Sequence, residues 1–267
     1  MRHELRRRLE ESGYSRPGFP ERYDAVRPRP PAVLLELLPQ LAAAERPRLV
    51  IDLGSGTGLS TRFWAQHADE VVGVEPNADM RRWAEERTNA DNVRYLEASS
   101  YETGLPDACA DLVGAAQSLQ WMDPEPAFAE IARILRPGGV FCAYEYFALQ
   151  TPLWEPEAAY EALRANVAEL RRERNLDEGK RLWPVSRERL EASGAFRFVR
   201  ELAAQSVEEG DGERLVGFAL SEGSLTTLLE AGVREDQVGL DRLREVAAHV
   251  KEPVPWWISY RVWVGLR

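Results

Sequence analysis

A glycine-rich turn is the strongest chemical signal in the sequence. Gly54, Gly56 and Gly58 follow an apolar run at 49–53, and a helical pattern begins directly after them. Glycine permits positive φ angles and a close backbone approach that a Cβ would block, and a helix N-terminus offers unpaired N–H groups to a carboxylate or phosphate. The third glycine comes one residue earlier than in the GxGxxG dinucleotide fingerprint, which argues against NAD.

A second polar signal is Glu75, which ends the apolar run 70–75 and lies 17 residues after Gly58. An acidic residue at the end of the second strand of such a fold can accept both hydroxyls of a ribose. A solvated strand end is the alternative interpretation. Because the glycine turn lies upstream, we favour ligand binding at Glu75.

The elements that must position these residues alternate between strand and helix patterns. Expected strands cover 49–53, 70–75, 92–98, 111–117 and 140–147, and expected helices cover 57–67, 78–87 and a segment carrying Phe128, Ile131, Ala132 and Leu135. A further helix at 33–41 precedes them. Such alternation predicts right-handed βαβ units and a parallel sheet.

The pattern changes after residue 150. A long helix is expected at 155–174, with Tyr160, Leu163, Val167 and Leu170 on one face and Arg171, Arg172 and Arg174 in solvent. Strands at 196–206 and 256–266 enclose helical stretches at about 212–231 and 235–250. The fold prediction is an α/β, Rossmann-like, seven-stranded, mostly parallel sheet with an antiparallel last strand, helices on both faces and a helical lid.

Four parts are expected along the chain. They are an N-terminal arm at 1–30 that covers a cofactor, a core at 31–150, a helical lid at 151–194, and C-terminal strands and helices at 195–267 that complete the sheet and the lid.

Composition limits the function. The chain has 267 residues, with 34 Lys+Arg against 44 Asp+Glu, and its net charge of −10 disfavours nucleic-acid binding. No apolar run is long enough for a membrane span, and residues 1–10 are too charged for a secretory signal. We expect a cytoplasmic protein with no metal site, since it has only three His and two Cys. Cys109 and Cys142 are expected to be buried without a disulfide.

The chain resembles the class I S-adenosylmethionine (SAM) dependent methyltransferases, in the small-molecule branch related to ubiquinone/menaquinone and trans-aconitate methyltransferases. The matching stretches lie within residues 20–147, and they are VIDLGSGTG at 50–58, VVGVEPNADM at 71–80, ETGLPDACADLVGAAQSLQWMD at 102–123 and FAEIARILRPGGVF at 128–141.

The resemblance implies SAM as the cofactor and a set of residues that bind it. Glu75 would hold the ribose, the glycine turn and Gln117 would lie along the methionine part, and Pro76 would lie against the adenine ring. Tyr23 and Arg27 match a Tyr-x-x-x-Arg-Pro segment that folds over the cofactor in the family. The full set is Tyr23, Arg27, Asp52, Gly54, Ser55, Gly56, Thr57, Gly58, Glu75, Pro76, Met80, Ser99, Ser100, Tyr101 and Gln117.

The acceptor side is less specified. Many relatives carry His-Trp where this chain has Gln120-Trp121, so a histidine base is absent there. Methyl transfer from a sulfonium is a direct displacement that needs mainly alignment, and the catalytic residue remains unknown. Trp121 is expected to line an acceptor pocket, and Gln120, Tyr144 and Tyr146 are further acceptor-binding residues. Glu145, Tyr144 and Tyr146, at the end of the fifth expected strand, are candidates for a general base, and packing at the sheet edge is the alternative interpretation.

Three functions compete. The first is a SAM-dependent methyltransferase that acts on a small-molecule acceptor at O, N or C. The second is a SAM-binding regulator or scaffold without turnover. The third is an NAD-type oxidoreductase, which the glycine spacing disfavours. The sequence gives no oligomeric state.

Overall fold

A computed structural model describes residues 18–176 and 183–267 of the chain. The chain divides into two units. One unit contains the sheet core and consists of 29–147, 181–206 and 259–267. The other unit consists of 1–28, 148–180 and 207–258 and is largely helical where it is described.

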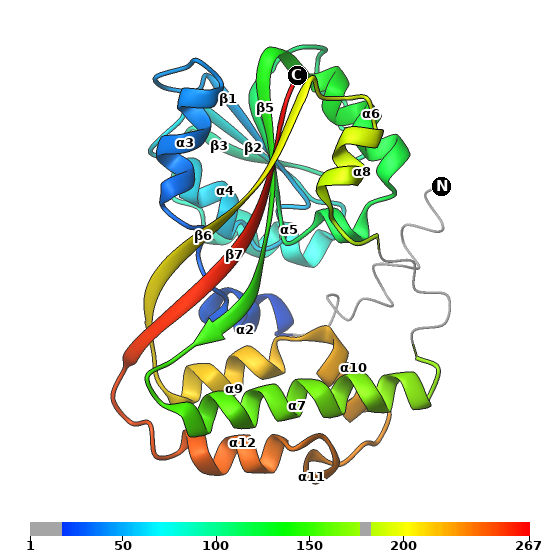
Figure 1. Ribbon diagram of the computed structural model, residues 1–267. Helices are drawn as coiled ribbons and strands as arrows, with labels where there is room; N and C mark the ends of the chain where they lie inside the picture. Colours follow the sequence, from blue (N-terminus) through cyan, green and yellow to red (C-terminus); the bar gives the residue numbers. More distant parts are fainter. Residues whose placement is uncertain (1–17, 177–182) are drawn as a thin grey trace. The chain divides into compact units, whose positions relative to one another are not determined.

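The sheet has seven strands in the order β3-β2-β1-β4-β5-β7-β6 (Figure 1). Their bounds are β1 Leu49–Leu53, β2 Glu70–Val74, β3 Val93–Leu96, β4 Ala110–Ala116, β5 Leu135–Gln150, β6 Phe198–Gly210 and β7 Val254–Leu266. The pairs β1–β2, β1–β4, β2–β3 and β4–β5 are parallel. This order places the carboxyl ends of β1, β2 and β4 next to one another.

The last strand runs against its neighbours. Gly138 donates its N–H to the carbonyl of Arg267 at 3.1 Å, and Arg267 donates to Gly139 at 3.0 Å, so the end of β7 pairs with the beginning of β5. Arg197, directly before β6, donates to Leu266 at 2.9 Å. The predicted α/β fold with an antiparallel last strand is therefore confirmed.

Helices of the sheet unit lie on both sides of the sheet, with α6 and α8 on one side and α3 and α4 on the other (Figure 1). Their bounds are α3 Val33–Leu41, α4 Leu59–Trp64, α5 Ala78–Arg87, α6 Pro124–Ile134 and α8 Arg187–Ala192, and a short 3-10 turn, η1, covers Leu119–Trp121.

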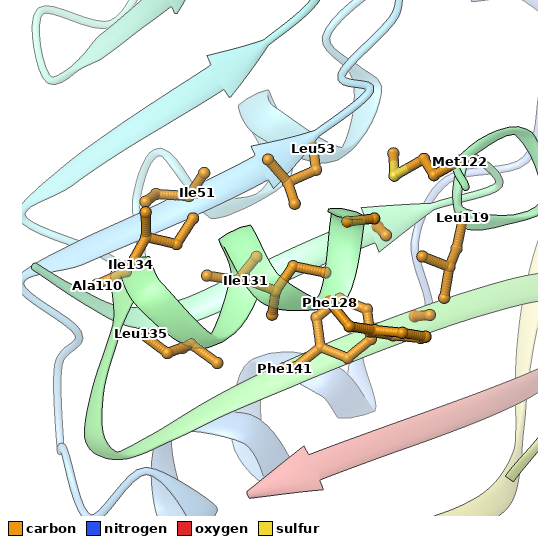
Figure 2. Packing of buried hydrophobic residues seen from close by; sticks show 14 of the residues in the cluster. Ile51, Leu53, Ala110, Leu119, Met122, Phe128, Ile131, Ile134, Leu135 and Phe141 are labelled. Atoms are coloured by element: carbon orange, nitrogen blue, oxygen red, sulfur yellow. The ribbon is translucent and has the colours of Figure 1, made fainter. Parts of the chain in front are cut away.

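The core beneath α6 joins apolar residues from strands that are distant in sequence. Figure 2 shows Ile51 and Leu53 of β1 facing Ile131 and Ile134 of α6. The ring of Phe141 stacks on Phe196 with centroids 5.4 Å apart. Each such fully buried side chain contributes roughly 1.5–3 kcal/mol relative to an exposed one. This packing holds the ends of the strands in fixed register.

The helical unit contains α2 Phe19–Val26, α7 Trp154–Glu173, α9 Gly212–Leu220, α10 Gly223–Glu230, α11 Glu235–Val238 and α12 Leu240–Ala247. Helix α7 buries Tyr160, Leu163 and Val167 as predicted, but the next buried position is Arg171 rather than Leu170. Arg171 donates to the carbonyl of Ser224 at 3.3 Å, so the expectation that it lies in solvent is wrong.

Several predicted helices are shorter than expected. Gly58 has φ +83°, which prevents α4 from beginning at residue 57. The stretch 212–231 breaks at Ser221 and Glu222, and the stretch 235–250 breaks at Gly239, whose φ is +82°. Leu135 begins β5 instead of ending α6. These breaks depend on local backbone geometry that periodicity alone does not contain.

No helix among the described residues has the length and apolar character needed to cross a membrane. Cys142 is buried and Cys109 is only partly buried, which corrects the expectation of two buried thiols. Neither of them forms a disulfide. Within the described ranges, no cluster of His, Cys, Asp and Glu could hold a metal ion.

Candidate cofactor site

The glycine turn joins β1 to α4 and is tied to the end of β2. Gly54 and Ser55 both donate their N–H groups to the carbonyl of Val74, at 2.9 and 3.2 Å. Gly56 donates to Oε2 of Glu75 at 2.8 Å. The turn and the acidic residue that the sequence singled out separately therefore meet at one point on the rim of the sheet.

The three glycines of the turn have different surroundings. All have positive φ, at +68° for Gly54, +54° for Gly56 and +83° for Gly58. An ideal Cβ at Gly54 would lie 2.7 Å from the Cβ of Ser118, and one at Gly58 would lie 2.3 Å from the hydroxyl of Tyr95. At Gly56 the same Cβ would meet nothing within 4 Å. Gly54 and Gly58 are thus required by packing, whereas Gly56 faces open space.

Glu75 is held by backbone donors from two elements. Its Oε1 accepts the N–H of Asn77 at 2.8 Å, and its Oε2 accepts that of Gly56. Burial raises the pKa of this carboxyl, and the two N–H groups oppose that effect. Each carboxylate oxygen has a second lone pair, so Glu75 can still accept hydroxyl donors from a ligand.

Asn77 positions Glu75, and sequence reasoning missed it. Its Oδ1 caps α5 by accepting the N–H groups of Asp79 and Met80, at 3.0 and 3.1 Å, while its own N–H holds Glu75. An Asn directly before a helical pattern is an N-cap signature. The segment EPNADM at 75–80 carries this signature, so the sequence alone could have identified Asn77 as a helix cap.

Asp52 lies on β1 with its carboxylate fully buried. Its Oδ2 accepts the hydroxyl of Thr61 at 2.7 Å, and its Oδ1 has no partner among the described residues. Burial raises its pKa to about 7, the Thr61 hydrogen bond lowers it, and the nearby charge of Glu75 raises it further. Such a carboxyl can respond to a cation brought close by a ligand.

Other polar atoms around this rim are also buried and lack a partner within the part of the chain that the structure describes. They are Oγ of Ser55, Oγ1 of Thr57, Nε2 of Gln117 and Oε1 of Gln120. Buried polar groups in native proteins are nearly always hydrogen-bonded. Ser55 and Thr57 belong to the turn itself, and Gln117 and Gln120 belong to the segment after β4, so unpaired polar atoms in both segments are consistent with a site for a polar ligand.

Gln117 follows β4 with a backbone that is unusual for its type. Its φ is +54°, and its N–H donates to Tyr144 at 3.0 Å. Strain of this kind in a non-glycine residue persists where the surroundings enforce it, often at binding sites. Its carbonyl accepts Nε2 of Gln120 at 3.0 Å, so both glutamines belong to one segment beside the turn.

The other residues that were predicted at the cofactor differ in burial and in contacts. Met80 is buried, whereas Pro76, Ser99 and Ser100 are partly exposed. The hydroxyl of Tyr101 accepts the N–H of Asp123 at 2.8 Å.

The residues predicted on the acceptor side belong to the sheet unit. Tyr144 donates its hydroxyl to Ser60 of α4 at 3.1 Å, and its pKa is raised by burial. Trp121 is 38% exposed, and the ring of Tyr146 lies edge-on to Tyr260.

Tyr23 and Arg27 belong to the helical unit. There the guanidinium of Arg27 stacks on the ring of Tyr23 at 4.6 Å and on Phe218 at 5.1 Å, and it donates to the carbonyl of Ser221 at 2.7 Å. Their predicted role in covering a cofactor stays a prediction, as does the division into arm, core and lid.

The sheet order and the rim at Gly54–Gly58 and Glu75 define a class I, Rossmann-like methyltransferase fold, and comparison with known proteins agrees. A family model described as "Methyltransferase domain" matches residues 51–143. Residues 51–143 are therefore a methyltransferase domain, and the resemblance to class I SAM-dependent methyltransferases is confirmed.

Relatives of known name match the same region. A malonyl-[acyl-carrier protein] O-methyltransferase of Pectobacterium atrosepticum is 38% identical over 108 residues, which are 40% of each chain. A Saccharomyces cerevisiae protein that is named a probable SAM-dependent methyltransferase is 30% identical over 129 residues. The match covers 46% of this chain and 44% of the relative. The chain thus spans less than half the length of the curated relatives it matches.

Two solved structures share the fold over most of this chain. One is described as a type II methyltransferase from Anaeromyxobacter dehalogenans, with a TM-score of 0.68, 24% identity and coverage of 90% of this chain and 97% of that one. The other is the Haemonchus contortus phosphoethanolamine N-methyltransferase 2 in complex with S-adenosylhomocysteine, with a TM-score of 0.53, 17% identity and coverage of 93% and 57%.

Proposed function

We propose that the protein is a SAM-dependent methyltransferase that acts on a small-molecule acceptor. The observation that carries this proposal is the rim itself. There Glu75 accepts the N–H of Gly56, an added Cβ at Gly56 would meet no atom within 4 Å, and buried polar atoms of the turn and of the segment after β4 have no partner among the described residues. A nucleoside with an amino-acid tail has the ribose hydroxyls, carboxylate and ammonium that such a rim can bind.

Glu75 would hold the ribose hydroxyls, because its carboxylate is fixed and keeps free lone pairs. The turn at 54–58 and Gln117 would lie along the methionine part, and Asp52 would attract its ammonium. Pro76, Met80, Ser99, Ser100 and Tyr101 would surround the adenine. SAM supplies an electrophilic methyl group on a sulfonium.

The chain's own contribution is alignment of the acceptor with that methyl group. Proximity and orientation can remove roughly 7–11 kcal/mol of a barrier. A general base is needed only where the acceptor nucleophile carries a proton, and we assign none. Gln120, Trp121, Tyr144 and Tyr146 are the side chains we propose for the acceptor side.

Calorimetry with SAM, S-adenosylhomocysteine and NAD tests the cofactor. We expect both sulfur nucleosides to bind and NAD to bind far more weakly or not at all. Incubation with methyl-labelled SAM and a metabolite extract then tests turnover, with label expected in a small molecule. Binding without any product would favour the regulatory alternative, and preference for NAD would overturn the proposal.

A further inference from the structure

Tyr95 of β3 lies in one row with a residue of the cofactor site. It pairs with Gly73 of β2, and Gly73 pairs in turn with Asp52 of β1. Residues that pair directly across neighbouring strands place their side chains on the same face of the sheet. Because Gly73 has no side chain, nothing from β2 separates Tyr95 from Asp52 on that face. All three residues belong to the sheet unit.

The ring of Tyr95 fills the space that two glycines leave. An ideal Cβ at Gly73 would lie 2.5 Å from Cδ1 of Tyr95 and 2.7 Å from its Cε1, and one at Gly58 would clash with its hydroxyl. Gly58 is both the last glycine of the turn and the N-cap of α4. The ring is therefore packed between strand β2 and the point where the turn enters the helix.

The hydroxyl of Tyr95 is fixed from the opposite side, at the end of α5. Thr88 donates its single hydroxyl hydrogen to the carbonyl of Ala84 at 2.6 Å, so Tyr95 is the donor in its 2.9 Å contact with Thr88. Burial raises the pKa of Tyr95, and Asp52 and Thr61 are among the groups that also act on it. The tyrosine oxygen thus lies near the carboxylate that Thr61 holds through Oδ2.

We infer that Tyr95 is a positioning residue of the cofactor site, which acts through the glycine turn and through Asp52. Its ring holds Gly58 in place and occupies the side of Asp52 that faces β2. The carboxylate then keeps one orientation on Thr61, and the turn keeps one path into α4. That these groups serve the methionine part of SAM rests on the proposed function.

Calorimetry with two nucleosides tests this role. S-adenosylhomocysteine carries the amino-acid tail, whereas 5′-methylthioadenosine has the same nucleoside and a thioether without that tail. If Tyr95 positions the groups at the tail, Tyr95→Leu should raise the Kd of S-adenosylhomocysteine roughly tenfold or more and that of methylthioadenosine less than about threefold. Tyr95→Phe keeps the ring, and we expect it to bind S-adenosylhomocysteine within about threefold of the wild type.

Phe196→Leu is the matched control for loss of a ring that packs on a glycine. An ideal Cβ at Gly265 would lie 2.6 Å from Cγ of Phe196, which stacks on Phe141 in the core beneath α6. Removing this ring should lower the thermal unfolding temperature at least as much as Tyr95→Leu does. Both nucleosides should nevertheless bind Phe196→Leu as they bind the wild type.

Tyr95→Met is the second variant if Tyr95→Leu does not fold, because its flexible side chain can refill the space. We expect the same selective loss of S-adenosylhomocysteine binding. Failure of both variants to fold would show that Tyr95 serves the fold alone, and would overturn the inference.

Two results separate this inference from the proposed function. A wild-type protein that does not bind S-adenosylhomocysteine would overturn the proposed function and the inference with it. A wild type that binds it, together with a Tyr95→Leu variant that binds it equally well or loses both nucleosides to the same extent, would overturn the inference alone.

Discussion

At the scale of single residues, Glu75 is the side chain on which the cofactor proposal depends most. Its two oxygens accept the N–H groups of Gly56 and Asn77. Glu75→Gln keeps the shape but replaces one acceptor by an amide donor, which faces a backbone N–H. We expect the Kd for SAM to rise roughly 10- to 100-fold, since a hydrogen bond to a charged group contributes about 1.5–3 kcal/mol. Calorimetry measures this change.

Glu70→Gln is the control for this substitution. Glu70 begins the strand that Glu75 follows, is half-buried and pairs with Arg94 at 2.8 Å. We expect its SAM affinity to equal that of the wild type. If Glu75→Gln bound SAM as tightly as Glu70→Gln, the ribose role of Glu75 would be wrong.

Asp52 should make the stability of the ligand-free protein depend on pH. Its folded pKa of about 7 lies above the value of roughly 3.9 for an unfolded aspartate. Between those values the folded state binds more protons than the unfolded state, so the free energy of unfolding falls as pH rises from about 4 to about 7 and then levels off. Glu75, whose pKa is also raised, acts in the same direction.

Asp52→Asn isolates this contribution, because the amide oxygen can still accept the Thr61 hydroxyl while no proton titrates. Denaturant unfolding at pH 5 and pH 8 should show the wild type losing roughly 2–3 kcal/mol relative to Asp52→Asn, because about two pH units of the titration lie in this range. Asp111 and Glu130 have lowered pKa values in both proteins, and their effects cancel in the comparison. A difference that stays constant with pH would contradict the assignment.

At the scale of elements, the turn between β1 and α4 separates the requirements of folding from those of binding. In Gly56→Ala the added Cβ would have no atom within 4 Å, but the residue would have to adopt the φ of +54° that Gly56 has. We expect a loss of about 1–2 kcal/mol in the free energy of unfolding from the left-handed backbone. We also expect at least tenfold weaker SAM binding, because the new Cβ occupies the space where the ligand must approach.

Gly104→Ala is the matched control, since Gly104 has φ +73° and open space around it but lies outside the turn. Both variants should lose similar stability in denaturant unfolding, and only Gly56→Ala should lose SAM affinity. Equal affinities in the two variants would contradict the proposal that Gly56 contacts the cofactor.

Much at this scale could be predicted from the sequence. The strands that lead to the glycine turn and to Glu75 were placed correctly, because buried parallel strands are continuous apolar runs bounded by turn residues. The positive φ of Gln117 could not be predicted, nor could the lack of a hydrogen-bond partner at Nη1 of Arg189 within the described part of the chain. Both depend on contacts with chain segments that are distant in sequence, which residue type and period do not encode. The same holds for the burial of Arg171 in place of Leu170.

At the scale of the whole molecule, we expect that residues 29–147, which include the methyltransferase domain at 51–143, do not fold on their own. Residues 29–147 contain β1 to the greater part of β5, but β5 pairs with β7, and Phe141 stacks on Phe196. A fragment of these residues would expose that ring and one edge of β5. We expect it to bind a hydrophobic dye and to unfold without a cooperative thermal transition, unlike the full chain. A sharp transition in the fragment would contradict this expectation.

The net charge of −10 bears on the class of acceptor. A polyphosphate is bound through basic residues that release its counterions, so an acidic protein should bind it poorly at about 0.15 M salt. We expect no change in the fluorescence anisotropy of labelled tRNA or duplex DNA up to micromolar protein. With methyl-labelled SAM and a whole-cell extract, label should appear in molecules that pass a small-pore filter and should be insensitive to nuclease. Label that precipitates with nucleic acid or protein would instead identify a macromolecular acceptor, because the small-molecule proposal predicts that both fractions stay at background.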